Sequence, residues 1–161
     1  MTDARNPQAK PVSASRVVLS HVMNPADANP LGSVHGGVIL RLVDEAGGVA
    51  AVRHARRPAV TVAMDSMTFR SPVPIGSLVT FKASVNYAGT TSMEVGVRVE
   101  TENLLTGEVR HTSSAYLVYV ALDEQGQPSP VPRLIPETEE DRRRIAAAEA
   151  RMAARLRQRK G

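Results

Sequence analysis

One segment of this chain reads as a long helix, and almost every other regular segment reads as a strand. From residue 36 to about residue 54, apolar residues recur at helical spacing with no proline before Pro58. Strand-like segments rich in β-branched residues lie at 16–22, 59–69, 78–87, 92–103 and 108–122. Nearly consecutive strands favour an antiparallel sheet, and a single apolar helix has to be covered by it. The sequence therefore predicts an α+β fold in which a curved antiparallel sheet of about five strands wraps one long central helix.

The two ends of the chain differ in character from this central part. Residues 1–15 are polar and contain two prolines, so we expect a disordered leader. Residues 16–136 form the predicted domain, and residues 137–161 a basic C-terminal helix or tail that begins near Thr138 as its N-cap. A thin apolar stripe among arginines favours a solvated or loosely docked tail, with packing on a neighbouring subunit or an anionic partner as the alternative.

Composition narrows the classes of function. The chain has no cysteine, which excludes disulfides, a thiolate nucleophile and Cys-based metal sites. The histidines show no metal-binding spacing, so we expect no metal and no cofactor. No signal-like or membrane-spanning segment is visible, so we expect a soluble, cytoplasmic protein without a membrane partner.

The net charge of +4 does not indicate nucleic-acid binding. Residues 142–161 hold eight of the twenty Lys and Arg but only one of the sixteen acidic residues, so the rest of the chain is mildly acidic. Aromatic residues make up 3% of the chain, too few for a base-stacking platform. We therefore expect no nucleic-acid partner.

The predicted helix carries one carboxylate in unusual surroundings. A helical wheel places a mainly apolar set on the side expected to face the sheet, comprising Ile39, Val43, Ala46, Ala50 and Arg53. On the opposite side Asp44 lies among Gly37, Leu40, Gly47, Gly48 and Ala51, while Glu45 points elsewhere. Adjacent glycines inside a helix cost about 1 kcal/mol each relative to alanine, which indicates close approach of another backbone or a thin ligand. The alternative is that Asp44 and Glu45 are ordinary surface acids with no functional role.

The start of the helix offers backbone donors. His35, Gly36 and Gly37 stand at the positive end of the helix dipole, where backbone N–H groups can hold an anion or a developing oxyanion. A tight turn that needs glycine would explain the same residues. His35 could act as a base, but no Ser/Asp arrangement supports a triad.

These groups suit thioester hydrolysis. A carboxylate, backbone donors and the amide of Asn29 are sufficient for it, because a leaving thiolate with a conjugate-acid pKa near 8.5 needs little acid assistance. Amide hydrolysis must protonate a poor leaving group, and phosphoryl transfer calls for a metal and a phosphate loop. Hydration of an enoyl thioester would ask for a paired Asp and His, which the spacing does not obviously supply.

Three motifs resemble the cytosolic acyl-CoA hydrolase family of hotdog thioesterases. They are Asn29-x5-His35-Gly36-Gly37-x6-Asp44, VTVAMDSMTFRSPVPIG at 60–76 and AGTTSMEV at 88–95, and the resemblance covers about residues 16–136. It implies a hotdog fold and hydrolysis of acyl-CoA, with Asp44 as general base or nucleophile. It further implies that the Gly36 N–H contributes to an oxyanion hole and that Asn29 positions the thioester or water.

The resemblance also implies partners and a mode of assembly. The partner would be acyl-CoA or CoA, and the chain would form hotdog dimers, three of which make a hexamer with sites at subunit contacts. Candidates for binding the CoA end are His35 and Gly37, Arg56 and Arg57, and the turn of Gly89, Thr90, Thr91 and Ser92. The two arginines equally suit a solvated helix end.

Several alternatives stay open at the level of sequence. The same fold could serve as a non-catalytic acyl-CoA sensor, with the basic tail as an interaction arm. The preferred acyl group could be a fatty chain, an aromatic or a branched group. The carboxylate could activate water or form an anhydride.

Overall fold

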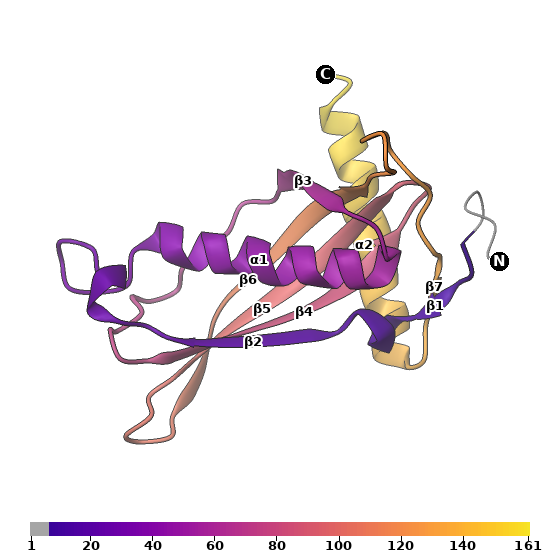
Figure 1. The fold of residues 1–161 in the computed structure, drawn as a ribbon. Coiled ribbons are helices and arrows are strands. Elements are labelled where there is room, and N and C mark those ends of the chain that lie inside the picture. Colours follow the sequence, from indigo (N-terminus) through magenta and orange to yellow (C-terminus); the bar gives the residue numbers. More distant parts are fainter. Residues whose placement is uncertain (1–6) are drawn as a thin grey trace.

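A five-stranded antiparallel sheet with one long helix across its face forms the body of the protein. The computed structural model describes residues 7–161. The strands lie in the order β2 (Val17–Val22), β4 (Leu78–Ala88), β5 (Ser92–Glu102), β6 (Val109–Ala121) and β3 (Ala59–Met64). Helix α1 (Gly36–Ala55) lies on one face of the sheet, as Figure 1 shows, and helix α2 (Glu139–Gln158) lies on the other. This arrangement confirms the predicted α+β fold. No helix in the described part of the chain is long and apolar enough to cross a membrane.

The core lies between α1 and the sheet. Alternate residues of β4 and β5 face the helix and are buried, namely Val79, Phe81, Ala83, Val85, Met93, Val95, Val97 and Val99. From α1, Ile39, Val43, Ala46 and Ala50 are buried as predicted. Arg53 is not. It is exposed and its Nη1 donates to the Arg16 carbonyl at 2.6 Å, because His54 takes the buried position and contacts the Pro132 carbonyl at 2.8 Å.

The predicted leader is partly ordered. Residues 1–6 lie outside the described residues, but β1 (Lys10–Pro11) pairs in parallel with β7 (Leu134–Ile135). A 3-10 helix, η1 (Val12–Ser15), follows and buries Val12 and Ser15. The Ser15 hydroxyl accepts a hydrogen bond from the Val85 N–H at 2.9 Å. Residues 10–15 are thus held by packing and hydrogen bonds that their polar composition does not reveal.

The loop before α1 and the strand after it also depart in detail from expectation. A short 3-10 helix, η2 (Pro25–Asp27), lies within the predicted loop and is closed by a capping box from Asn24. Strand β3 ends at Met64 rather than near residue 69. Beyond it the Asp65 N–H donates to the Tyr116 carbonyl and the Asp65 side chain pairs with Arg155, so the chain leaves the sheet register there.

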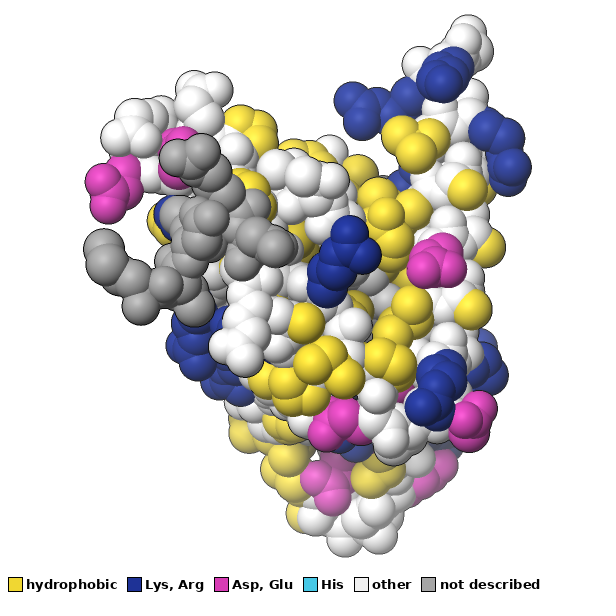
Figure 2. Space-filling model, turned by 90° about the vertical axis from the view of Figure 1, so that its right-hand side faces the viewer, with side chains coloured by type: hydrophobic (Ala, Val, Ile, Leu, Met, Phe, Trp, Pro, Cys, Tyr) yellow, Lys and Arg dark blue, Asp and Glu magenta, His cyan; other side chains and the backbone are white. Residues whose placement is uncertain are grey.

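Helix α2 is docked on the sheet rather than solvated. It begins at the predicted N-cap, Thr138, which forms a capping box with Asp141. Its Arg151 and Arg155 both pair with Glu94, a fully buried residue of β5, at 2.7 and 2.8 Å. The Arg151 guanidinium also lies 3.7 Å from the centre of the Tyr116 ring. In Figure 2 the C-terminal end of α2 projects beyond the body and carries Lys and Arg side chains, so only part of its positive charge is used for docking.

Removing Arg155 should destabilise the fold. Arg155 pairs with both Glu94 and Asp65, and loss of one partner of a buried ion pair costs about 3–5 kcal/mol. Since Arg151 still pairs with Glu94, we expect Arg155→Ala to lower the free energy of unfolding by about 3 kcal/mol in urea titrations. Arg157→Ala, an exposed change on the same helix, is the control and should stay within about 0.5 kcal/mol. Equal stability of the two variants would contradict the docking role of Arg155.

Candidate active site

Asp44 lies in the middle of α1 with one carboxylate oxygen held by two hydroxyls. Thr61 Oγ1 donates to Asp44 Oδ1 at 2.6 Å, and Tyr119 Oη lies 3.0 Å from the same oxygen and 3.0 Å from the Asp44 carbonyl. Thr61 and Tyr119 are direct cross-strand partners in the β3–β6 register, so two paired strands present their hydroxyls together. No residue of the described chain hydrogen-bonds to Oδ2. The half-buried carboxylate is therefore oriented through one oxygen and can act through the other.

Tyr119 is suited to remain a hydrogen-bond donor. Burial raises the pKa of its phenol, and the neighbouring Asp44 charge raises that pKa further. The hydroxyl therefore keeps its proton at neutral pH. It thus stays available as a donor to Asp44.

The structure explains one of the two helical glycines beside Asp44. A Cβ at Gly47 would lie 2.5 Å from the Tyr119 hydroxyl oxygen, which is closer than real Cβ contacts occur. The close approach inferred from the sequence is therefore made at this position by a side chain of the same chain. A Cβ at Gly48 would lie at an ordinary 3.8 Å from the Tyr119 ring, so nothing in the described chain requires glycine there.

At the start of α1 the predicted backbone donors are only partly free. The Gly37 N–H donates to His35 Nδ1 at 3.1 Å, which makes His35 the N-cap of the helix. Within residues 7–161 the Gly36 N–H has no hydrogen-bond partner. The Phe69 ring lies beside Gly36: a Cβ added at Gly36 would be 3.8 Å from it. Of the two glycines, Gly36 is the one whose N–H can bind an oxyanion.

Asn29 organises the loop that precedes the helix. Its Oδ1 accepts from the N–H groups of Leu31 and Ser33 at 2.9 and 3.2 Å, and its Nδ2 donates to Ser33 Oγ at 3.0 Å. It makes no hydrogen bond to Asp44. Gly36 and Asp44 are eight residues apart on one helix, roughly 12 Å along its axis. Within one chain, Asp44 and the donors at the helix start therefore cannot act on the same carbonyl group.

The candidate residues for the CoA end fall into two separate groups. The turn of Gly89, Thr90, Thr91 and Ser92 is closed by a hydrogen bond from the Gly89 N–H to the Ser92 carbonyl at 2.8 Å. The Thr90 carbonyl accepts a hydrogen bond from the Val131 N–H. Pro132, which follows Val131, contacts His54 near the end of α1 through its carbonyl. This places the turn at the same end of the helix as Arg56, its left-handed C-cap, and Arg57. His35 and Gly37 stand at the other end, roughly 30 Å away along the axis.

Sequence reasoning missed Thr61 and Tyr119. Each lies in a segment whose residues suit a strand; Thr61 falls within the motif at 60–76, but no role is assigned to it from that motif, and Tyr119 lies in none of the three motifs. Only the pairing of β3 with β6 brings both to Asp44. Among residues 7–161, no group of three or more His, Cys, Asp or Glu side chains could hold a metal ion.

The two neighbouring glycines provide a test of this geometry. Gly47→Ala should displace the Tyr119 hydroxyl and lower the melting temperature, because its Cβ has no room. Gly48→Ala should instead raise stability by up to about 1 kcal/mol, since alanine is the better helix former and the space is open. Combining Gly47→Ala with Tyr119→Phe should recover part of the loss. If both alanine variants behaved alike in thermal unfolding, the steric role of Tyr119 would be refuted.

Comparison with known proteins places this chain among thioesterases. Residues 31–108 match the family model described as "Thioesterase superfamily". The chain is 40% identical to Protein VdlD of Helicobacter pylori over 89% of this chain and 82% of that protein. It is 39% identical to the uncharacterized acyl-CoA thioester hydrolase YkhA of Bacillus subtilis, over 84% of this chain and 78% of that one. The cytosolic acyl coenzyme A thioester hydrolase of Mus musculus is 34% identical over 91% of this chain and 39% of its own length.

Solved structures agree in fold over almost the whole chain. An apo-hexameric acyl-CoA thioesterase superposes with a TM-score of 0.90 at 40% identity, covering 94% of this chain and 97% of that one. An acyl-CoA hydrolase from Staphylococcus aureus, solved with butyryl coenzyme A and coenzyme A, gives 0.87 at 31% identity over 94% and 92% of the two chains. Structures of that enzyme also exist with an asparagine, an aspartate or a threonine changed to alanine.

Proposed function

The chain belongs to the hotdog-fold acyl-CoA thioester hydrolases of the thioesterase superfamily, and we propose that Asp44 is the group through which it hydrolyses acyl-CoA to a carboxylic acid and CoA. The observation that carries this proposal is the geometry of Asp44. Its Oδ1 is fixed by Thr61 and Tyr119, and its Oδ2 has no partner in the described chain.

The spacing of three substituted residues in a relative supports Asp44 as the catalytic group. In the Staphylococcus aureus enzyme, the changed asparagine and aspartate are 15 positions apart, and the threonine follows 17 positions later. Asn29, Asp44 and Thr61 have the same spacing in this chain. The three positions chosen for substitution in that relative thus correspond to the asparagine, carboxylate and threonine proposed for this site.

The proposed reaction proceeds by general-base catalysis. Asp44 Oδ2 takes a proton from a water molecule, whose oxygen attacks the thioester carbonyl carbon. The Gly36 N–H stabilises the oxyanion that forms, with the positive end of the helix dipole behind it. The C–S bond then breaks, and the thiolate leaves without strong acid assistance because its conjugate acid has a pKa of about 8.5. The proton held by Asp44 then passes to the thiolate or to solvent, which restores the base. Water and the substrate are the only reactants, so the proposed reaction involves no separate cofactor.

The site is proposed to be completed by a second copy of the chain. Since Gly36 and Asp44 are roughly 12 Å apart along one helix, a thioester held by one copy's Asp44 would meet the Gly36 and Asn29 of another. Strand β3 supports such a contact, because it is an edge strand with Val60, Val62 and Met64 all exposed. We propose hotdog dimers assembled three to a hexamer, the oligomer that the apo-hexameric relative forms.

The remaining candidates receive different proposed roles. Arg56, Arg57 and the turn at 89–92 cluster at one end of α1 and are proposed to bind the phosphates of CoA. His35 and Gly37 are proposed to shape the helix start around Gly36, since they hydrogen-bond to each other. A cytoplasmic location is proposed because the mouse relative is named cytosolic.

Asp44→Asn tests the function directly. Replacing the base by an amide should lower the release of free thiol from acyl-CoA by about 10²- to 10⁴-fold, the usual contribution of a general base. Glu45→Gln is the matched control, because Glu45 is exposed, pairs only with Arg41 and should keep wild-type activity. Both variants should fold alike by circular dichroism.

Two outcomes of this assay would count against the proposal. An Asp44→Asn variant with wild-type turnover would exclude Asp44 as the base. A wild-type protein that binds acyl-CoA tightly and releases no thiol from any chain length or aryl group would indicate a sensor.

A further inference from the structure

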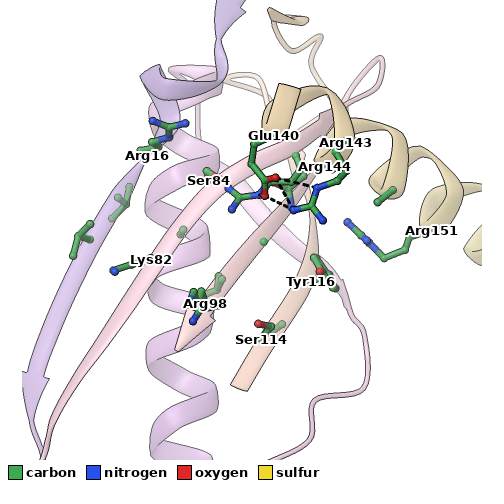
Figure 3. A pocket seen from close by; sticks show the side chains of 18 residues that line it. Arg16, Lys82, Ser84, Arg98, Ser114, Tyr116, Glu140, Arg143, Arg144 and Arg151 are labelled. Atoms are coloured by element: carbon green, nitrogen blue, oxygen red, sulfur yellow. Dashed lines mark hydrogen bonds and ion pairs between the residues drawn. The ribbon is translucent and has the colours of Figure 1, made fainter. Parts of the chain in front are cut away.

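A groove lies on the face of the sheet opposite α1. It has a volume of about 560 Å³, within the range of small-molecule sites, and lies between the outer surface of β2, β4, β5 and β6 and the first turns of α2. Figure 3 shows side chains from both sides converging on it, with Ser84, Ser114 and Tyr116 on the sheet and Glu140, Arg143 and Arg144 on the helix. The sheet separates this groove from Asp44.

The groove is strongly basic. Its lining includes six Lys or Arg residues and one acid, Glu140. Arg143 and Arg144 share Glu140 as their ion-pair partner. Lys82 and Arg98 likewise share Glu100, and Arg151 shares Glu94 with Arg155. Arg16 also pairs with Asp141 and Arg155 with Asp65, but Glu140 and Glu100 are each divided between two cations, so positive charge remains for a bound anion.

One polar side chain in the floor of the groove has no partner. Asn86 is 6% exposed, lines the groove, and its amide makes no hydrogen bond to any described residue. Asn86 is the extra residue of a β-bulge in β4, where the register with β5 shifts between Val85 and Tyr87. Its amide atoms are open to the groove rather than sealed in the core, so the amide is available to a ligand that enters the groove.

Gly96 makes room for this amide. It lies inside β5, where glycine weakens a strand and marks the close approach of another group. A Cβ at Gly96 would collide with Asn86 Nδ2. The bulge at Asn86 and the neighbouring Gly96, whose register partner on β4 is Ser84, therefore place an amide, able both to donate and to accept, among the cations.

From the basic lining and the unpartnered amide together, we infer that this groove binds a small phosphorylated anion of about nucleotide size. Arg98 and Arg144 face the groove from the sheet and the helix, and arginine matches phosphate geometry by bidentate hydrogen bonds. Asn86 would contact the phosphate or a neutral polar group of the same ligand. The ligand could be a free nucleotide or the nucleotide end of a CoA molecule other than the one held at Arg56 and Arg57, since the two have the same phosphate chemistry.

Calorimetric titration of the intact protein at low salt tests this site, with ATP, inorganic pyrophosphate and CoA as probes. Asn86→Asp keeps the size of the side chain and places a negative charge in the floor. Arg98→Ala with Arg144→Ala removes one cation from each wall. The expected result is binding of ATP and pyrophosphate to the wild type, weakened about tenfold or more in both variants. Arg142→Ala with Arg157→Ala lowers the net charge equally outside the groove and should leave affinity within about twofold.

Measurements in parallel make every outcome informative. Melting temperatures identify a variant that fails to fold, in which case Asn86→Ala serves as the second floor variant. Loss of a CoA-binding event in the groove variants, with KM for acyl-CoA unchanged, would identify the nucleotide end of CoA as the ligand, whereas loss of ATP binding alone would identify a free nucleotide. The inference is overturned if no probe binds the wild type at millimolar concentration, or if groove variants bind as the wild type does. It is also overturned if those variants change only the oligomeric mass, which would make the groove a subunit interface.

Discussion

The contact of Tyr119 with α1 is the interaction on which the proposed active site depends. The hydroxyl occupies the space that a side chain at Gly47 would fill and reaches both the carbonyl and the carboxylate of Asp44. This one contact therefore fixes both the distance between α1 and β6 and the orientation of the Asp44 carboxylate. Thr61, opposite Tyr119 on the edge strand, ties the same carboxylate oxygen to β3. The carboxylate is thus preorganised by the packing of helix on sheet, which costs nothing further when substrate binds.

The two faces of the sheet are built on different physical principles. The face toward α1 is apolar and packs aliphatic side chains against the helix. The face toward α2 is polar, and α2 is attached through Glu94, which two arginines neutralise where it is buried. Since α2 covers only part of this face, the uncovered part keeps its cations and forms the basic groove. Some arginines of the C-terminal segment therefore hold α2 on the sheet, and the others remain exposed to solvent.

Features governed by local periodicity were predictable from the sequence, and features governed by long-range contacts were not. The long helix, the five strands and the N-cap at Thr138 follow from spacing and capping chemistry. Asp44 is predicted as the catalytic carboxylate from its glycine surroundings and from the family resemblance, and that role stays a prediction. Thr61 and Tyr119 were missed because they reach Asp44 only through strand pairing across 17 and 75 residues.

The docking of the two chain ends also depends on long-range contacts that the sequence does not predict. Glu94 alternates with core residues and reads as a surface acid until α2, some 57 residues later, covers it. Residues 10–15 read as a polar leader because the segment with which Lys10 and Pro11 pair, residues 134–135, is equally short and lies near the other end of the chain. In both cases the deciding partner is too distant in sequence for local patterns to indicate it.

The central claim is that Asp44 of one copy works with Asn29 and Gly36 of another, and subunit mixing tests it most directly. Asn29→Ala and Asp44→Asn proteins should each be nearly inactive alone. After dissociation and joint reassembly, statistical mixing within two-fold dimers should restore about a quarter of wild-type thiol release, because half the dimers then contain one intact site. Native mass spectrometry would establish that mixed oligomers have formed. Mixed oligomers with no recovery of activity would contradict a site shared between subunits.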